Sequence, residues 1–111
     1  MPNKAATLNH IFRALADPTR RAVIEALHDG PASISELARP FGMALPSFAQ
    51  HLDALEDCGL VRSRKAGRVR TYRLSTASLT KVARWLDVQR DHWEGRLDRF
   101  DQFVTKTHTQ G

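Results

Sequence analysis

The apolar residues near the start of the chain fall at helical spacing. One helix face is marked by four of them: Leu8, Ile11, Phe12 and Leu15. This pattern ends at Asp17, which is a favourable N-cap, and Pro18 is favourable at the first position of a helix. We therefore expect a first helix that ends before Asp17 and a second that begins at Pro18 and ends before Gly30.

The next two predicted helices are short and close together. Ser33, followed three residues later by Glu36, forms a capping-box pattern that opens a short helix, and Gly42 lies in the turn after it. Pro46 then begins a helix over about residues 45–57. Its expected core-facing residues are Leu45, Phe48, Ala49, Leu52 and Leu55. Two short helices joined by a tight turn are typical of a helix-turn-helix.

Two extended runs and a long amphipathic segment follow. Residues 60–65 and 68–74 are expected to be strands joined at Ala66-Gly67, which predicts a β-hairpin. A last helix is expected over about residues 78–104. Its apolar residues are spaced by three, four or seven: Val82, Leu86, Trp93, Leu97 and Phe100. The element order predicts a mainly α protein with a small β-hairpin, forming a single domain over residues 1–111.

Composition agrees with one small globular domain. Hydrophobic residues make up 41% of the 111 residues and charged residues 26%, which is enough to form one core. No segment approaches 18 consecutive apolar residues, so we expect a cytoplasmic protein that does not contact a membrane. Cys58 is the only cysteine, which excludes an intrachain disulfide.

The positive charge is concentrated in the predicted hairpin. The chain has seventeen Lys and Arg against twelve Asp and Glu, but residues 62–73 contain no acidic residue. The basic residues there are Arg62, Arg64, Lys65, Arg68, Arg70 and Arg73. A charged strand can simply protect a sheet edge from aggregation. A hairpin so one-sided in charge instead favours contact with the phosphates of double-stranded DNA.

The helix before the hairpin carries a compact polar face opposite its apolar one. The residues that we expect to contact DNA there are Pro46, Ser47, Gln50 and His51. Gln can pair with an adenine edge in the major groove, and Ser or His can reach bases or phosphates. Such a face is ordinarily just solvated. The basic hairpin that follows favours the DNA-binding interpretation.

Four motifs together resemble the ArsR family of bacterial winged-helix repressors. They are Asp17-Pro18-Thr19-Arg20-Arg21, Ser33-Ile34-Ser35-Glu36-Leu37-Ala38, Pro46-Ser47-Phe48-Ala49-Gln50-His51-Leu52 and Gly59-Leu60-Val61. The resemblance covers roughly residues 7–75. It implies a winged helix-turn-helix with its recognition helix at about residues 45–57 and its wing at about residues 62–73. Ala44 stands where the family usually has a capping Ser or Thr.

The resemblance also implies a homodimer on an inverted repeat, paired through the first and last helices. The apolar stripes independently indicate such an interface, because a long last helix exposes more apolar surface than one small domain covers. The expected interface residues are Leu8, Ile11, Phe12, Leu15, Val82, Leu86, Trp93, Leu97 and Phe100. A monomer whose last helix folds back at Gly95 is the alternative.

Other functional classes receive little support from the sequence. Many relatives in this family sense metals, but the Cys pair and the Asp and His pairs that they use are missing here, so we expect the metal-independent subgroup. We expect no cofactor and no enzymatic activity, because no nucleophile lies near a base. The remaining alternative is a winged-helix protein-interaction module without a specific operator. The sequence identifies no effector.

Overall fold

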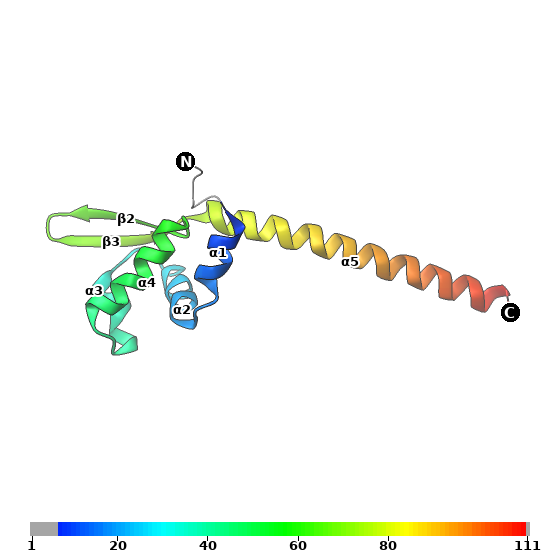
Figure 1. The fold of residues 1–111 in the computed structure, drawn as a ribbon, viewed down its shortest axis with the longest axis horizontal. Helices are drawn as coiled ribbons and strands as arrows, with labels where there is room; N and C mark the ends of the chain where they lie inside the picture. The colour runs from blue at the N-terminus through cyan, green and yellow to red at the C-terminus, as the bar shows by residue number, and fades with distance from the viewer. Residues whose placement is uncertain (1–6, 111) are drawn as a thin grey trace. The chain divides into compact units, whose positions relative to one another are not determined.

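The computed structural model describes residues 7–110, and the side chains of residues 7–97, 99 and 100. The elements follow in the order α1 (Leu8–Leu15), α2 (Pro18–Leu27), β1 (Ala32–Ser33), α3 (Ile34–Ala38), the 3₁₀ helix η2 (Arg39–Phe41), α4 (Leu45–Asp57), β2 (Val61–Ala66), β3 (Val69–Leu74) and α5 (Thr76–Gln110) (Figure 1). Contacts divide the chain into two compact units, residues 1–81 and residues 82–111. The predicted mainly α winged helix-turn-helix fold is confirmed.

Side-chain caps fix the beginnings of the first three helices. Asp17 accepts hydrogen bonds from the backbone N–H groups of Thr19 at 2.8 Å and Arg20 at 3.2 Å, which starts α2 as predicted. The capping box of α3 is also confirmed. Ser33 Oγ accepts from the Glu36 N–H at 3.2 Å, and Glu36 Oε1 accepts from the Ser33 N–H at 3.0 Å.

The sheet differs from the expected hairpin in two respects. It has three antiparallel strands in the order β1-β3-β2, and the two-residue strand β1 pairs Ala32 with Tyr72. The turn of the hairpin is formed by Gly67 and Arg68, not by Ala66 and Gly67, because Ala66 pairs with Val69. Gly67 has φ +63°, while the described non-glycine residues all have negative φ, as a two-residue turn with glycine in its first position requires.

The core of the first unit is built from the helices and the base of the sheet. Its fully buried side chains include Ile11, Val23, Phe48, Leu52, Leu55, Leu60 and Val61. The prediction that Leu45 faces this core is wrong, since 46% of Leu45 is exposed. Leu45 is the first residue of α4 and precedes the turns of the helix that pack inward. In α1 the buried pair is Ile11 and Ala14, so Phe12 remains partly exposed.

Helix α5 begins in the first unit and forms nearly all of the second. Ser78 in its first turns is buried, and its Oγ donates to the Cys58 carbonyl at 2.7 Å. The helix is 35 residues long and continues through Gly95, which extends it beyond the expected residues 78–104. In the second unit, several large apolar side chains are exposed: Leu86, Val88, Trp93, Leu97 and Phe100. No helix in the described part is long and apolar enough to span a membrane.

Candidate nucleic-acid interface

Helix α4 begins at a turn that leaves its first N–H groups without a side-chain cap. Gly42 adopts φ +59°, which reverses the chain after η2, and Ala44 then occupies the N-cap position. Alanine has no side-chain acceptor, so no cap hydrogen bond forms there. The uncapped N-terminus of a helix carries a partial positive charge that favours an anion such as a phosphate.

The two faces of α4 differ sharply in burial. Phe48, Leu52 and Leu55 are fully buried, and the Phe48 ring lies 5.4 Å from the Phe41 ring of η2, measured between centroids. On the opposite face, Pro46, Ser47 and Gln50 are exposed. The structure therefore leaves these three predicted DNA contacts accessible near the N-terminal end of the helix.

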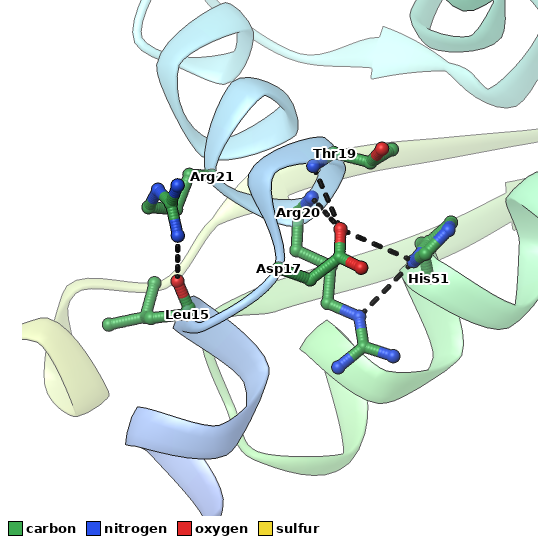
Figure 2. A network of polar contacts seen from close by, with 6 residues as sticks. All are labelled: Leu15, Asp17, Thr19, Arg20, Arg21 and His51. Carbon is green, nitrogen blue, oxygen red and sulfur yellow. Dashed lines mark hydrogen bonds and ion pairs between the residues drawn. The ribbon is translucent and has the colours of Figure 1, made fainter.

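The fourth predicted contact in α4, His51, is held in a polar cluster at the N-terminus of α2 (Figure 2). Arg20 Nε donates to His51 Nδ1 at 3.2 Å, and Asp17 Oδ1 lies 3.9 Å from the same nitrogen. Only 20% of the His51 side chain is exposed. Burial acts to raise the pKa of the Asp17 carboxyl, but the N–H groups of Arg20 and Thr19 and the nearby His51 and Arg20 side chains hold it below its usual 3.8.

The strand register divides the basic residues of the wing between two faces of the hairpin. In this antiparallel ladder, directly paired residues lie on the same face. Arg62 pairs with Arg73, and Lys65 pairs with Arg70. Arg64 shares the face of Arg62 because the two residues are two positions apart, whereas Arg68 lies in the turn. Each face thus carries a pair of like charges directly opposite each other.

A chain of three polar side chains joins the wing to α4. Glu56 Oε2 accepts from the Ser63 Oγ at 2.7 Å and from the Ser63 N–H at 3.1 Å. Arg70 Nη1 in turn donates to Ser63 Oγ at 2.8 Å. Tyr72 pairs with Ser63 and is buried, and burial raises the pKa of its hydroxyl. These contacts fix the base of the hairpin beside the C-terminal half of α4.

Most cations of the wing have no acidic partner. Arg62 Nε donates to Ser75 Oγ at 3.4 Å, and Arg70 donates to Ser63. Within the described residues, the side chains of four wing cations form neither a hydrogen bond nor an ion pair: Arg64, Lys65, Arg68 and Arg73. All six basic residues of the wing are exposed. The wing therefore presents an unneutralised positive surface.

Cys58 and the histidines do not form a second site. Cys58 is buried, and this burial raises the pKa of its thiol. Its Sγ lies 3.4 Å from the Leu55 carbonyl oxygen, to which it donates. In the part of the chain that the structure describes, no three His, Cys, Asp or Glu residues are grouped in a way that could hold a metal ion.

Sequence reasoning missed the contacts that four residues make on this surface: Asp17, Arg20, Glu56 and Ser63. Arg20 and Asp17 contact His51, whereas the sequence indicated only a capping role for Asp17 and a place in a family motif for Arg20. Glu56 of α4 accepts a hydrogen bond from Ser63 of the wing, a contact that the sequence did not indicate. The alternation of side chains along the two strands could have placed Arg73 opposite Arg62. The Arg20–His51 contact joins residues 31 positions apart, so no pattern of neighbouring residues indicates it.

Comparison with known proteins agrees with this geometry. Residues 15–64 match a family model described as a helix-turn-helix domain. The HTH-type transcriptional regulator Rv2034 of Mycobacterium tuberculosis is 42% identical over 93 residues, which cover 84% of each chain. The transcriptional repressor SdpR of Bacillus subtilis is 29% identical over 79 residues, covering 71% of this chain and 88% of the repressor.

A solved structure extends the likeness to three dimensions. The crystal structure of the ArsR family transcriptional regulator RHA00566 superposes with a TM-score of 0.75 at 56% identity, covering 78% of this chain and 90% of that one. All three relatives are named as transcriptional regulators or repressors. From the fold, the exposed face of α4, the basic wing and these relatives, it follows that the chain belongs to the ArsR family of winged helix-turn-helix transcriptional regulators.

Proposed function

We propose that this regulator is a repressor that binds an inverted repeat in duplex DNA as a homodimer. Helix α4 enters the major groove and reads bases, and the β2–β3 wing contacts the flanking phosphates. Pro46, Ser47, Gln50 and His51 form the reading surface, and Arg62, Arg64, Lys65, Arg68 and Arg70 form the phosphate-binding surface. The name of the Bacillus subtilis relative, a transcriptional repressor, supports the direction of regulation.

One observation carries this proposal: the wing places like charges opposite each other with no acid to neutralise them. Like charges in directly paired positions of a sheet reduce its stability. The pairs Arg62–Arg73 and Lys65–Arg70 therefore disfavour the free hairpin. A polyanion on this surface removes that repulsion, and the row of phosphates along a DNA backbone has the required charge density.

The reading role of α4 is tested with two exposed side chains that make no contact with the core. Ser47→Ala and Gln50→Ala should each lower affinity for the operator by about 5- to 150-fold, the loss expected for a good base contact, and should leave affinity for random DNA nearly unchanged. Asp53→Ala, on the same helix but further from its N-terminus, is the control. Equal losses on operator and random DNA would contradict the assignment of α4 as the reader.

The proposed dimer interface is formed by apolar residues of α1 and α5 that are exposed in the single chain. Trp93 is 61% exposed and Phe100 is 64% exposed, and Leu86 and Leu97 lie on the same side of α5 by helical spacing. Phe12 in α1 is also partly exposed, and Leu8 and Leu15 are half-buried. Ile11 and Val82, assigned to the same interface from the sequence, are buried in the single chain.

The proposed interface predicts a specific pair of variants. Trp93→Asp combined with Leu97→Asp should give monomers that bind one half-site weakly, because each places a charge in an apolar interface. Val88→Asp is the matched control, since Val88 is half exposed but lies on the opposite side of α5 by helical spacing. Sedimentation at micromolar concentration measures the outcome. A double variant that still dimerises would overturn this interface.

We also propose that no metal ion controls this regulator. The positions that hold thiols in the Cys-pair sensors are here occupied by Glu36, Leu37, Ala38 and Arg39, and Asp87 is followed two residues later by Gln89 rather than His. Zinc, cadmium, nickel and arsenite at one equivalent per chain should leave operator affinity unchanged. Dissociation caused by one equivalent of a single ion would contradict the proposal.

A further inference from the structure

The contact between Arg20 and His51 constrains the chemistry of a side chain on the proposed reading helix. A guanidinium has only N–H donors and no acceptor. Since Arg20 Nε donates to His51 Nδ1 at 3.2 Å, that ring nitrogen must be the acceptor. A neutral imidazole that accepts at Nδ1 carries its proton on Nε2. Arg20 therefore selects one of the two neutral forms of His51.

The other ring nitrogen is left to face an outside partner. No buried side-chain nitrogen or oxygen among the described residues lacks a hydrogen-bond partner, and the structure gives Nε2 no partner within that part of the chain. Nε2 is therefore reached by solvent. The two nitrogens of an imidazole point in divergent directions, so the Nε2–H is directed away from Asp17 and Arg20 (Figure 2).

We propose that Arg20 is a positioning residue that makes His51 a fixed hydrogen-bond donor toward DNA, and that His51 selects guanine at the base it contacts. This proposal rests on the DNA-reading role of α4 given above. Guanine presents two acceptors, N7 and O6, on its major-groove edge and no donor, whereas adenine and thymine each present one acceptor and cytosine presents only a donor there. The opposite neutral form of His51 would present an acceptor and would select against guanine.

Asp17 favours the other neutral form of His51, so the form that is present depends on the Arg20 hydrogen bond. The Asp17 carboxylate accepts hydrogen bonds and lies 3.9 Å from His51 Nδ1. Without the Arg20 donor, this acceptor remains beside Nδ1 and favours a proton on that nitrogen. Arg20 thus favours an unprotonated Nδ1, and Asp17 favours a protonated one. When Arg20 is removed, only the effect of Asp17 remains.

Arg21 offers a matched control for the loss of charge. It is the next residue of α2, and its Nη1 donates to the Leu15 carbonyl at 2.8 Å rather than to His51 (Figure 2). Arg20→Met and Arg21→Met each remove one positive charge and keep a long side chain. A difference between them therefore reports the contact with His51 and not the change in net charge.

The first measurement is the ¹⁵N spectrum of the histidine rings in the DNA-free protein, with His51 assigned by comparison with His51→Gln. In the wild type and in Arg21→Met, Nδ1 should give the signal of an unprotonated ring nitrogen and Nε2 that of a protonated one. In Arg20→Met, Nδ1 should become protonated. A protonated Nδ1 in the wild type, or an unchanged Nδ1 in Arg20→Met, would overturn the proposal.

The second measurement is base preference at each position of a selected duplex. His51→Ala should relax the preference for guanine at one position by about tenfold, and Arg20→Met should relax the same position by a similar factor while Arg21→Met does not. Relaxation of a different position by Arg20→Met would overturn the positioning role. If the wild type selects no sequence at all, the proposed function fails, and the DNA-free ¹⁵N spectrum still tests the state of His51 separately.

Discussion

Three cations near the tip of the wing should supply much of the salt dependence of DNA binding. Lys65 and Arg70 face each other next to the turn, and Arg68 lies in the turn itself. We consider the variant in which all three are replaced by Gln, which keeps polar side chains of similar length. Each phosphate contact with duplex DNA contributes about −0.9 to the slope of log K against log salt. Two wings with three contacts each therefore account for a slope of about −5.

That slope corresponds to a large and measurable difference. Between 50 and 200 mM salt, the wild type should lose about 10³-fold more affinity than the triple variant, on operator and random DNA alike. Fluorescence anisotropy at four or more salt concentrations measures both slopes. Base preference should stay the same, because phosphate contacts carry no sequence information.

The control must change net charge equally without changing the wing. Arg84, Arg96 and Arg99 are exposed on α5, and their triple replacement by Gln removes the same charge. It should change the slope by less than about 1. The wing variant should also keep its free energy of unfolding within about 1 kcal/mol, since relief of the Lys65–Arg70 repulsion offsets loss of the Arg70–Ser63 hydrogen bond. Equal slopes for wild type and wing variant would refute the reasoning.

Three further predictions concern the elements that hold the interface. Ser63→Ala removes the 2.7 Å hydrogen bond that joins the wing to Glu56 of α4, so operator affinity should fall while base preference stays the same. A change in base preference, measured by competition binding, would contradict the role of Ser63 in holding the wing. Ala44→Ser supplies the missing cap of α4 and should raise the free energy of unfolding by about 1 kcal/mol, whereas Ser33→Ala removes the cap of α3 and should lower it by a similar amount. Denaturant titration measures both changes. A destabilised Ala44→Ser variant would show that the cap cannot form. Because the folded pKa of Asp17 lies below 3.8, the stabilising contribution of its carboxylate is complete above that pH and is lost as the pH falls through the lower folded value. Asp17→Asn caps α2 equally well but cannot titrate, so the free energy of unfolding of this variant should fall less between pH 5 and pH 2 than that of the wild type. Parallel curves of stability against pH would contradict this assignment.

The sequence predicted best those features that depend on neighbouring residues. Asp17 and Ser33 begin helices through hydrogen bonds within three residues, and α2 and α3 start where these two residues indicated. Pro46 favours the start of α4 through its own restricted backbone angle. The bounds of α4, Leu45–Asp57, coincide with the expected ones. The hairpin turn was misplaced by one residue, because Ala66-Gly67 and Gly67-Arg68 both contain the glycine that the turn needs and only strand pairing separates them.

Features that join distant segments were not predictable in this way. The strand β1 has only two residues and exists because Ala32 pairs with Tyr72, forty positions away. The exposure of Leu45 depends on what packs around the start of α4, which helical periodicity does not determine. The Arg20–His51 and Glu56–Ser63 contacts require the three-dimensional arrangement of α2, α4 and β2. Composition thus indicated where the proposed DNA-binding surface lies, but it did not indicate the contacts within that surface.

The central claim is that two copies of this chain read an inverted repeat through α4. Selection of bound duplexes from a random DNA pool by the purified protein, followed by sequencing, tests it most directly. The account predicts an enriched palindrome whose half-sites are centred about 10 base pairs, or one further helical turn, apart, with guanine at the position that His51→Ala relaxes. A pool without an enriched sequence, or an enriched site without twofold symmetry, would contradict it.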